Sequence, residues 1–459
     1  SGTKTQLAVN SQRRIQNRLS SQLLVRKNKL NTLATAREVT TTTSESAKST
    51  DSAKEMRGVH TTAHGYLCNV HSPEGGNVGV NKQLAIYSTV TLASSSYALK
   101  DTIIADPLFI KLSLVIPIDI ERKKLSAVFV NGDLIGYTEN SISLISKYKK
   151  LRRNLTINPY TTIHWDVVQD EVYFWVDSGR LIRPMFIVYN TIDNPEMFDR
   201  KTIKSGKFTQ SIAITEKHIE SLLKKDITMH ELIENGVIEY VSAEEQTNVL
   251  LCYELDRLKQ DKHNPLIRYT HCDTPQAQLG ITALTSPFAS HNQSTRLVYQ
   301  TNQAKQTCGY FALNWAYRCD KAAFLQYRNE SALARTIVNR YVTANGSNCI
   351  VGIACQGFNQ EDSLVCNRAA IHRGLFDGSK FTYLITKLDQ KESFGVPDIN
   401  TTKDIKSANY SKLDSRGFIR EGAVIEHGDA IVGKFSKLTR IESTKYLYSD
   451  QSLIYKDKE

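Results

Sequence analysis

Two adjacent carboxylates, Glu361 and Asp362, lie in the segment best suited to chemistry, residues 357–376 (GFNQEDSLVCNRAAIHRGLF). The residues before them are rich in Gly, Asn and Gln, which favours a turn, and helical spacing follows. In a turn both acids can face one cation, such as a metal ion that carries a nucleotide. Alternatively, Asp362 or Ser363 caps the following helix, whose dipole favours negative charge. These residues alone leave both interpretations open.

Four possible zinc ligands, His60, His64, Cys68 and His71, lie close together in the sequence. Gly65 and the turn that follows His71 argue against one helix presenting all four. The chain has eight cysteines but no CxxC pair, which indicates scattered reduced thiols of an intracellular protein. We therefore do not favour zinc at this cluster. For His60 and His64 we favour structural hydrogen bonds over a role as proton carriers.

The length of 459 residues suggests roughly three or four domains. No stretch reaches about 18 consecutive apolar residues, so no membrane span is expected. The chain starts with Ser1 and has no secretory signal, so we expect processing or excision from a longer polypeptide. The net charge of +11 points to a polyanionic partner. Basic residues gather in 1–37 and in 147–153 (KYKKLRR), where they form either a solvated face or phosphate contacts.

The sequence pattern predicts a mixed α/β (α+β) multidomain fold with irregular mixed sheets and helices. Residues 127–138 (AVFVNGDLIGYT) indicate two short strands around an Asn-Gly turn. A helix is expected over 141–153, followed by further strands up to residue 190. The Ser/Thr-rich stretch 40–55 has no apolar periodicity and is expected to be a mobile loop.

Several blocks, in order, resemble the second-largest (β-type) subunit of multisubunit DNA-dependent RNA polymerases. They include 57–80 (RGVHTTAHGYLCNVHSPEGGNVGV), 177–188 (DSGRLIRPMFIV), 233–245 (IENGVIEYVSAEE), 269–306 (YTHCDTPQAQLGITALTSPFASHNQSTRLVYQTNQAKQ) and 357–376. The resemblance covers most of the chain with family-like spacing. It implies the central portion of that subunit, either a fragment or a split subunit of a virus or jumbo phage.

The resemblance also implies a division into domains. Residues 1–117 would form a fork-like region with the mobile loop 40–55, and 118–190 a small α+β external domain 1. Residues 191–260 would form external domain 2. Residues 261–459 would form the first part of the hybrid-binding domain and end before the wall or flap.

The same resemblance implies roles for individual residues around the nucleotide. The rigid donor fork of Arg296 suits a triphosphate, and Arg296 would contact the phosphates of the incoming nucleotide. Tyr299 would pack beside that nucleotide, and Lys305 and Gln306 would lie near the RNA 3′ end or the hybrid backbone. In the fork block, Arg57 and Glu74 are candidates for contacts with nucleic acid or with an active-centre partner. A surface salt bridge is the alternative for Arg296.

The chain lacks a DFDGD-like triple-Asp signature, which in the family belongs to the largest subunit. The resemblance therefore implies Mg²⁺ held mainly by that β′-type partner, while Glu361 and Asp362 support a second metal, mostly through water. The expected activity is DNA-directed RNA polymerase (nucleotidyltransferase), within a complex that holds the RNA–DNA hybrid.

Expected partners are the largest subunit, the remaining β-type portions, assembly subunits, the DNA template, the RNA product and NTPs, without a membrane. The expected location is intracellular, in an infected host cell or a virion if the protein is viral. Two other functions compete with this one. The basic excess and the missing metal triad would fit a non-catalytic nucleic-acid-binding protein. A metal-dependent nucleotidyl enzyme that works alone would depend only on Glu361 and Asp362.

Overall fold

The computed structural model describes residues 24, 26–40, 57–204, 206–320, 322–342, 345–438 and 446–456. Apart from Thr40, the predicted mobile loop 40–55 lies outside these residues, as does most of the basic segment 1–37. The chain divides into two compact units, residues 1–381 and 382–459. The α+β multidomain fold predicted from the sequence is confirmed by several mixed sheets with short helices. No helix in the described ranges is long and apolar enough to cross a membrane.

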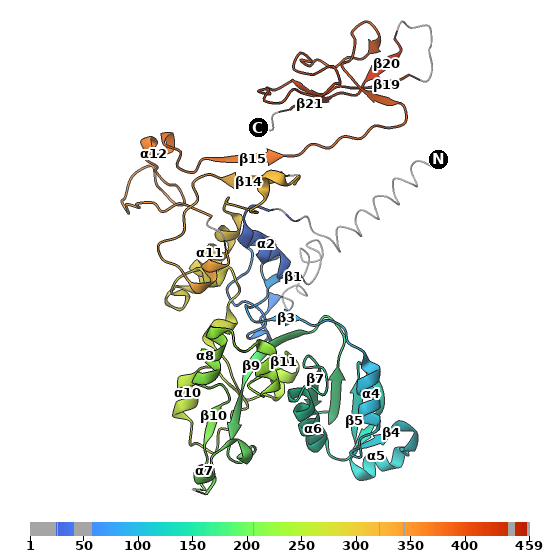
Figure 1. Ribbon diagram of the computed structural model, residues 1–459, viewed down its shortest axis with the longest axis vertical. Helices are drawn as coiled ribbons and strands as arrows, with labels where there is room; N and C mark the ends of the chain where they lie inside the picture. The colour runs from blue at the N-terminus through green and yellow to red at the C-terminus, as the bar shows by residue number, and fades with distance from the viewer. Residues whose placement is uncertain are drawn as a thin grey trace. The chain divides into compact units, whose positions relative to one another are not determined.

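The first sheet of unit 1 has five strands and lies beside helices α4, α5 and α6 (Figure 1). In spatial order its strands are β4 (Phe109–Lys111), β6 (Asp133–Thr138), β5 (Ser126–Val130), β8 (Glu171–Trp175) and β7 (Thr162–Asp166). The helices are α4 (Ser96–Ile104), α5 (Pro117–Lys123) and α6 (Ser141–Arg153). Strand β5 runs parallel to β8, and every other strand pair in this sheet is antiparallel. Side chains from α4, α6 and the strands share one buried apolar core.

The hairpin and the helix predicted in this region are confirmed. Asn131 and Gly132 link β5 to β6 with φ of 50° and 87°, which is the left-handed geometry of a tight hairpin turn. The Asn140 side chain accepts a hydrogen bond from the Ser143 backbone N–H and starts α6. Local chemistry therefore decides both elements.

The second sheet has six strands and is organised around the long strand β9 (Leu181–Asn190). Strand β9 pairs antiparallel with β3 (Thr89–Val90), β10 (Gln210–Ile212), β11 (Ile238–Ser242) and β13 (His271–Cys272). Strand β12 (Leu251–Cys252) pairs parallel with β13. The associated helices are α7 (Arg200–Lys204), α8 (Glu216–Lys224), α9 (Met229–Glu234) and α10 (Leu255–Gln260). The last strand of predicted segment 118–190 thus belongs to this sheet, while α4 and β4, before residue 118, belong with the first sheet.

Buried ion pairs join α6 to the second sheet. Arg152 is 1% exposed; its guanidinium contacts Glu239 of β11 and donates to Glu245 at 2.7 Å. Arg153 also pairs with Glu239, at 2.7 Å, and His271 Nε2 lies 3.2 Å from the same carboxylate. Burial favours the neutral acid, but Arg153 and Arg152 outweigh it and hold the pKa of Glu239 well below its usual range.

This ion cluster changes the interpretation of the basic segment 147–153. Lys147 pairs with Asp106 at 2.7 Å, and Lys149 lies 3.5 Å from Glu245. Together with Arg152 and Arg153, these cations neutralise acids of the same chain. Most of the cations of the segment are therefore paired with acids of the same chain, and only Lys150 is exposed and without an ion pair among the described residues.

The remaining part of unit 1 contains helix α11 (Ser294–Gln306) and several shorter elements. They are α2 (Lys29–Ala36), the antiparallel pair β1 (Glu38–Thr40) and β2 (Asn81–Gln83), the pair β14 (Ala322–Gln326) and β15 (Gly378–Thr382), and α12 (Arg368–His372). Helix α2 packs against α11. This contact joins α11 to a segment that lies far from it in the sequence.

Unit 2 consists of short strands in two small sheets. The four-stranded sheet has the order β16 (Glu392–Phe394), β19 (Lys434–Lys437), β20 (Tyr448–Asp450) and β17 (Thr402–Lys403). Strands β18 (Ala430–Val432) and β21 (Leu453–Ile454) form the other sheet. Lys434 pairs with Glu392 across the neighbouring strands β19 and β16.

Candidate nucleotide and nucleic-acid interface

Helix α11 carries four of the predicted site residues, and its buried face fixes how they are presented. Leu297 packs with Val70 and Ala283 in a small apolar cluster, and Thr301 is fully buried. Arg296 and Tyr299 are exposed on the same helix. The Arg296 Cζ atom lies 5.6 Å from the Tyr299 ring centroid, so the ring supports the guanidinium by a cation–π contact.

Arg296 has no carboxylate within ion-pair distance among the described residues. The alternative of a surface salt bridge is therefore not supported in that part of the chain. Its planar donor fork faces solvent and can accept a bidentate anion such as a phosphate.

The glycine-rich segment 57–80, which we call the fork segment, lies directly against α11. The amide of Asn302 donates to the Ser72 carbonyl at 3.0 Å and to the Glu74 carboxylate at 3.3 Å. Lys305 Nζ lies 3.3 Å from His71 Nε2. Two predicted site residues, Glu74 and Lys305, thus both take part in hydrogen bonds between α11 and the fork segment. The sequence alone did not predict a role for Asn302. The feature that could have indicated one is a polar residue next to Thr301 on the buried side of α11.

Arg57 closes the fork segment on itself. Its guanidinium donates to the carbonyls of Val78 at 2.6 Å and of Gly76 at 2.9 Å. Gly79 has φ +73°, and a Cβ there would come within 2.8 Å of the Arg57 carbonyl. The contact with nucleic acid that the sequence predicts for Arg57 stays a prediction.

The acidic pair lies in a turn, as the sequence predicts. Glu361 has φ +53°, and both Glu361 and Asp362 are exposed. The capping alternative is wrong: α12 starts only at Arg368, and its cap is Asn367, whose side chain accepts from the Ala369 N–H at 2.9 Å. Five further residues separate Asp362 from the helix start, which leaves its carboxylate out of reach of the first turn.

The zinc alternative for His60, His64, Cys68 and His71 is also wrong. His60 accepts from the Thr62 N–H and caps a 3-10 helix, and His64 packs edge-on against Tyr253. Throughout the described ranges, no three His, Cys, Asp or Glu side chains gather closely enough to hold a metal ion. Glu361 and Asp362 therefore do not form a complete metal site with other described side chains, and their supporting role toward a metal stays a prediction.

Four protein-family models match the chain in the order of their domain numbers. RNA polymerase Rpb2 domain 3 matches residues 22–90, domain 4 matches 128–189, domain 5 matches 230–275 and domain 6 matches 282–459. The chain belongs to the Rpb2 family. The resemblance drawn from the sequence is confirmed. The domain 3 match contains the fork segment, and the domain 6 match contains α11 together with Glu361 and Asp362.

Similar proteins agree with this assignment. The chain is 31% identical over 458 residues to DNA-directed RNA polymerase II subunit RPB2 of Encephalitozoon cuniculi, covering 94% of the chain and 37% of that protein. It is 29% identical to DNA-directed RNA polymerase II subunit 2 of Arabidopsis thaliana (88% and 34%) and to DNA-directed RNA polymerase subunit 2 of Acanthamoeba polyphaga mimivirus (95% and 38%). The chain spans roughly a third of the length of these curated relatives.

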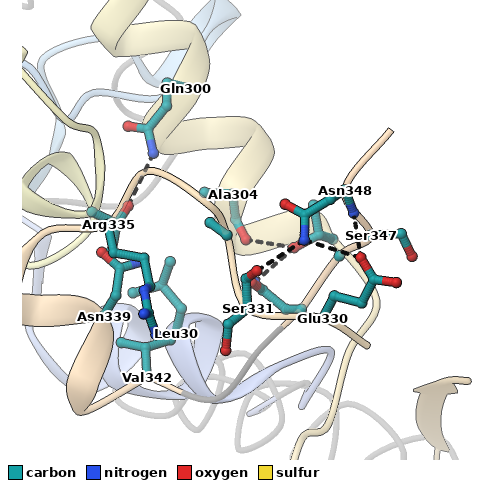
Figure 2. A pocket seen from close by; sticks show the side chains of 15 residues that line it. Leu30, Gln300, Ala304, Glu330, Ser331, Arg335, Asn339, Val342, Ser347 and Asn348 are labelled. Atoms are coloured by element: carbon teal, nitrogen blue, oxygen red, sulfur yellow. Dashed lines mark hydrogen bonds between the residues drawn. The ribbon is translucent and has the colours of Figure 1, made fainter. Parts of the chain in front are cut away.

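A polar cavity of about 280 Å³ lies beside α11 in this Rpb2-family chain (Figure 2). Gln300 and Ala304 line it from the helix, and Glu330 and Asn348 line it from the segment that follows β14. The Glu330 carboxylate accepts from the Asn348 backbone N–H at 2.9 Å and from its side-chain amide at 3.0 Å. None of the predicted site residues lines this cavity, so it is separate from the predicted interface.

The end of α11 is held by one buried side chain, Asn28. Its amide donates to the carbonyls of Ala304 at 3.1 Å and Thr307 at 2.7 Å, while its oxygen accepts from the Asn31 N–H at 2.6 Å and caps α2. Asn28 thus satisfies the ends of two helices at once. An asparagine at this position is a typical helix cap, so the cap of α2 could be predicted from the sequence. The contact of Asn28 with the end of α11 could not.

We expect Asn28→Ala to lower the free energy of unfolding by about 2–3 kcal/mol, because it leaves groups at two helix ends without partners. The measurement is urea denaturation of the purified chain. Asn140→Ala is the matched control, since Asn140 is an exposed cap of α6 alone and should cost only about 1 kcal/mol. Equal losses in the two variants would contradict a double role for Asn28.

Proposed function

We propose that the chain is part of the β-type subunit of a DNA-dependent RNA polymerase and completes the active centre from the nucleotide side. The carrying observation is that α11 presents Arg296 and Tyr299 to solvent while Asn302 and Lys305 bond its other side to the fork segment. A nucleotide site built on a rigid, doubly anchored helix keeps its phosphate contact in register.

Each predicted residue has a part in this proposal. Arg296 binds the phosphates of the incoming nucleotide through charge-assisted hydrogen bonds, and Tyr299 orients the guanidinium and packs beside the nucleotide. Lys305 and Gln306, at the end of α11, face the RNA 3′ end or the hybrid backbone. An RNA–DNA hybrid would be held through its shape and phosphates, which suits a basic chain.

Divalent metal ions, when bound, stabilise charge on the attacking and leaving oxygens. Mg²⁺ would be held mainly by the largest subunit, with Glu361 and Asp362 positioning the second ion through water. Both carboxylates are exposed in a turn, so they are accessible to a partner chain. The proposed partners are that subunit, the other β-type portions, assembly subunits, DNA, RNA and NTPs.

We expect the isolated chain to synthesise no RNA on any template, because the described part holds no complete metal site. Purification of the native protein should show co-elution with a chain that bears DFDGD, and the co-eluting complex should extend RNA. The chain without partners serves as the control. Robust synthesis by the chain alone would refute the proposal, and a lone nucleic-acid-binding monomer would favour the non-catalytic alternative.

A further inference from the structure

A buried histidine that the proposed function does not use lies between the fork segment and α11. His71 is 5% exposed, and both of its ring nitrogens have partners. Nε2 lies 3.3 Å from Lys305 Nζ, and Nδ1 lies 3.2 Å from the hydroxyl of the fully buried Thr282. His71 therefore contacts two residues, Thr282 and Lys305, that each lie more than 200 residues after it in the sequence.

The chemistry of the partners fixes the protonation of the ring. A lysine ammonium can only donate, so Nε2 of His71 must accept and carry no proton. The proton then resides on Nδ1, which donates to the Thr282 hydroxyl. Burial, and then the charge of Lys305, lower the pKa of His71 to about 4, which agrees with a neutral ring.

The burial and the charge partners of Lys305 indicate what its contact with His71 does. The side chain is half-buried, and burial lowers the pKa of Lys305 despite the opposing charge of Glu38. Among the described side chains no carboxylate lies within ion-pair distance of its ammonium. The neutral acceptor on His71 thus holds one donor of the ammonium without an ion pair, so the ammonium can still attract an external anion.

We propose that His71 is a positioning residue that aims the Lys305 ammonium at the RNA, so that the fork segment sets the position of this cation. This inference rests on the proposed function, in which Lys305 faces the RNA 3′ end. Packing alone does not require a histidine here, because the neighbouring Val70 already packs against Leu297 of α11. The specific contribution of His71 is an acceptor of fixed tautomer at the ammonium.

The test uses the polymerase assembled with variant chains and measures single-nucleotide extension as a function of NTP concentration. His71→Leu should slow the maximal extension rate by about tenfold, the size of one charge-assisted contact, with little change in the KM for NTP. His71→Gln, which offers an amide oxygen as acceptor, should recover most of the rate. In a Lys305→Ala background, His71→Leu should cause little further loss.

A second readout follows the position of Lys305 without activity. Acylation of the Lys305 amine, quantified by mass spectrometry of the assembled enzyme, should be faster by about threefold or more in His71→Leu, because the released amine reaches solvent. Thr282→Val keeps the side-chain volume but removes the hydroxyl partner of His71. It should also speed acylation of Lys305 and slow the maximal extension rate, by smaller factors than His71→Leu. If the enzyme with His71→Leu does not assemble, Thr282→Val takes its place in the test. Val172→Ala, in the apolar core of the first sheet, is the packing control and should reduce assembly or thermal stability without changing the maximal rate per assembled enzyme.

The outcomes separate the inference from the proposed function. Unchanged Lys305 acylation, or equal defects in His71→Leu and His71→Gln, would overturn the positioning role. Changed acylation combined with normal extension by Lys305→Ala would support the positioning of Lys305 by His71 but refute the RNA-facing role of Lys305. Changed acylation, slow extension and rescue by glutamine would support both.

Discussion

Replacing Arg152 with methionine should destabilise unit 1 by about 3–5 kcal/mol, because it leaves the buried Glu245 without its main cation and removes one of the two arginines that pair with Glu239. Glu239 and Glu245 are 2% and 0% exposed, and water cannot take over the role of the guanidinium. Methionine keeps the length and the apolar contacts of the arginine stem, so the loss reports charge pairing and not a cavity. Urea denaturation of the purified chain at neutral pH measures this loss in the free energy of unfolding.

The control for Arg152 is the same change at an exposed ion pair. Arg257 pairs with Asp261 at 3.1 Å, but its side chain is 60% exposed, so Arg257→Met should cost far less. The pH dependence gives a second signature. The pKa of Glu239 is held below its usual 4.5, so its contribution to stability is present above pH 4.5 and disappears as the pH falls further.

The difference in the free energy of unfolding between the wild type and Arg152→Met should therefore become smaller as the pH falls below 4.5. A gap that stays constant below pH 4.5, or a loss no larger than that of Arg257→Met, would contradict a buried ion cluster. Glu245→Gln combined with Arg152→Met should recover part of the stability, because a neutral amide is cheaper to bury than an unpaired carboxylate.

The comparison of sequence and structure shows which features local chemistry determines. The hairpin at residues 127–138 and helix α6 were predictable, because an Asn-Gly turn and an amphipathic repeat act within a few residues. The fate of the basic residues on α6 was not predictable. Arg152 meets Glu239 and Glu245 across 87 and 93 residues of sequence, and only the folded chain brings them together.

The candidate site divides in the same way. The resemblance pointed to Arg296, Tyr299 and the acidic pair because their motifs are short and contiguous. The anchors of α11 stayed hidden, because His71 and Asn28 reach the helix over 234 and 279 residues of sequence. The alternative that placed a helix cap at Asp362 or Ser363 was wrong, since the actual cap of α12, Asn367, has an equally suitable residue type a few positions later.

In the assembled polymerase, Arg296→Ala should lower the efficiency of nucleotide use by about 10- to 100-fold, equivalent to about 1.5–3 kcal/mol for charge-assisted hydrogen bonds. The guanidinium is exposed, stacked on Tyr299 and without an ion-pair partner in the described part of the chain, so its removal disturbs no internal pairing. Steady-state extension at varied NTP concentration gives kcat/KM for each variant.

Two further variants assign the effect of Arg296 to geometry. Arg296→Lys keeps the charge but loses the bidentate fork and the flat face that stacks on the ring, so it should recover only part of the efficiency. Tyr299→Leu should lower kcat/KM by a smaller factor than Arg296→Ala, because the guanidinium stays but loses the contact with the ring.

The control for charge is Arg122→Ala, which removes an exposed arginine from α5. It takes away one positive charge and should leave kcat/KM unchanged. If Arg296→Ala behaves like Arg122→Ala, Arg296 does not contact the nucleotide; if lysine fully restores kcat/KM, charge alone suffices and the bidentate contact is refuted.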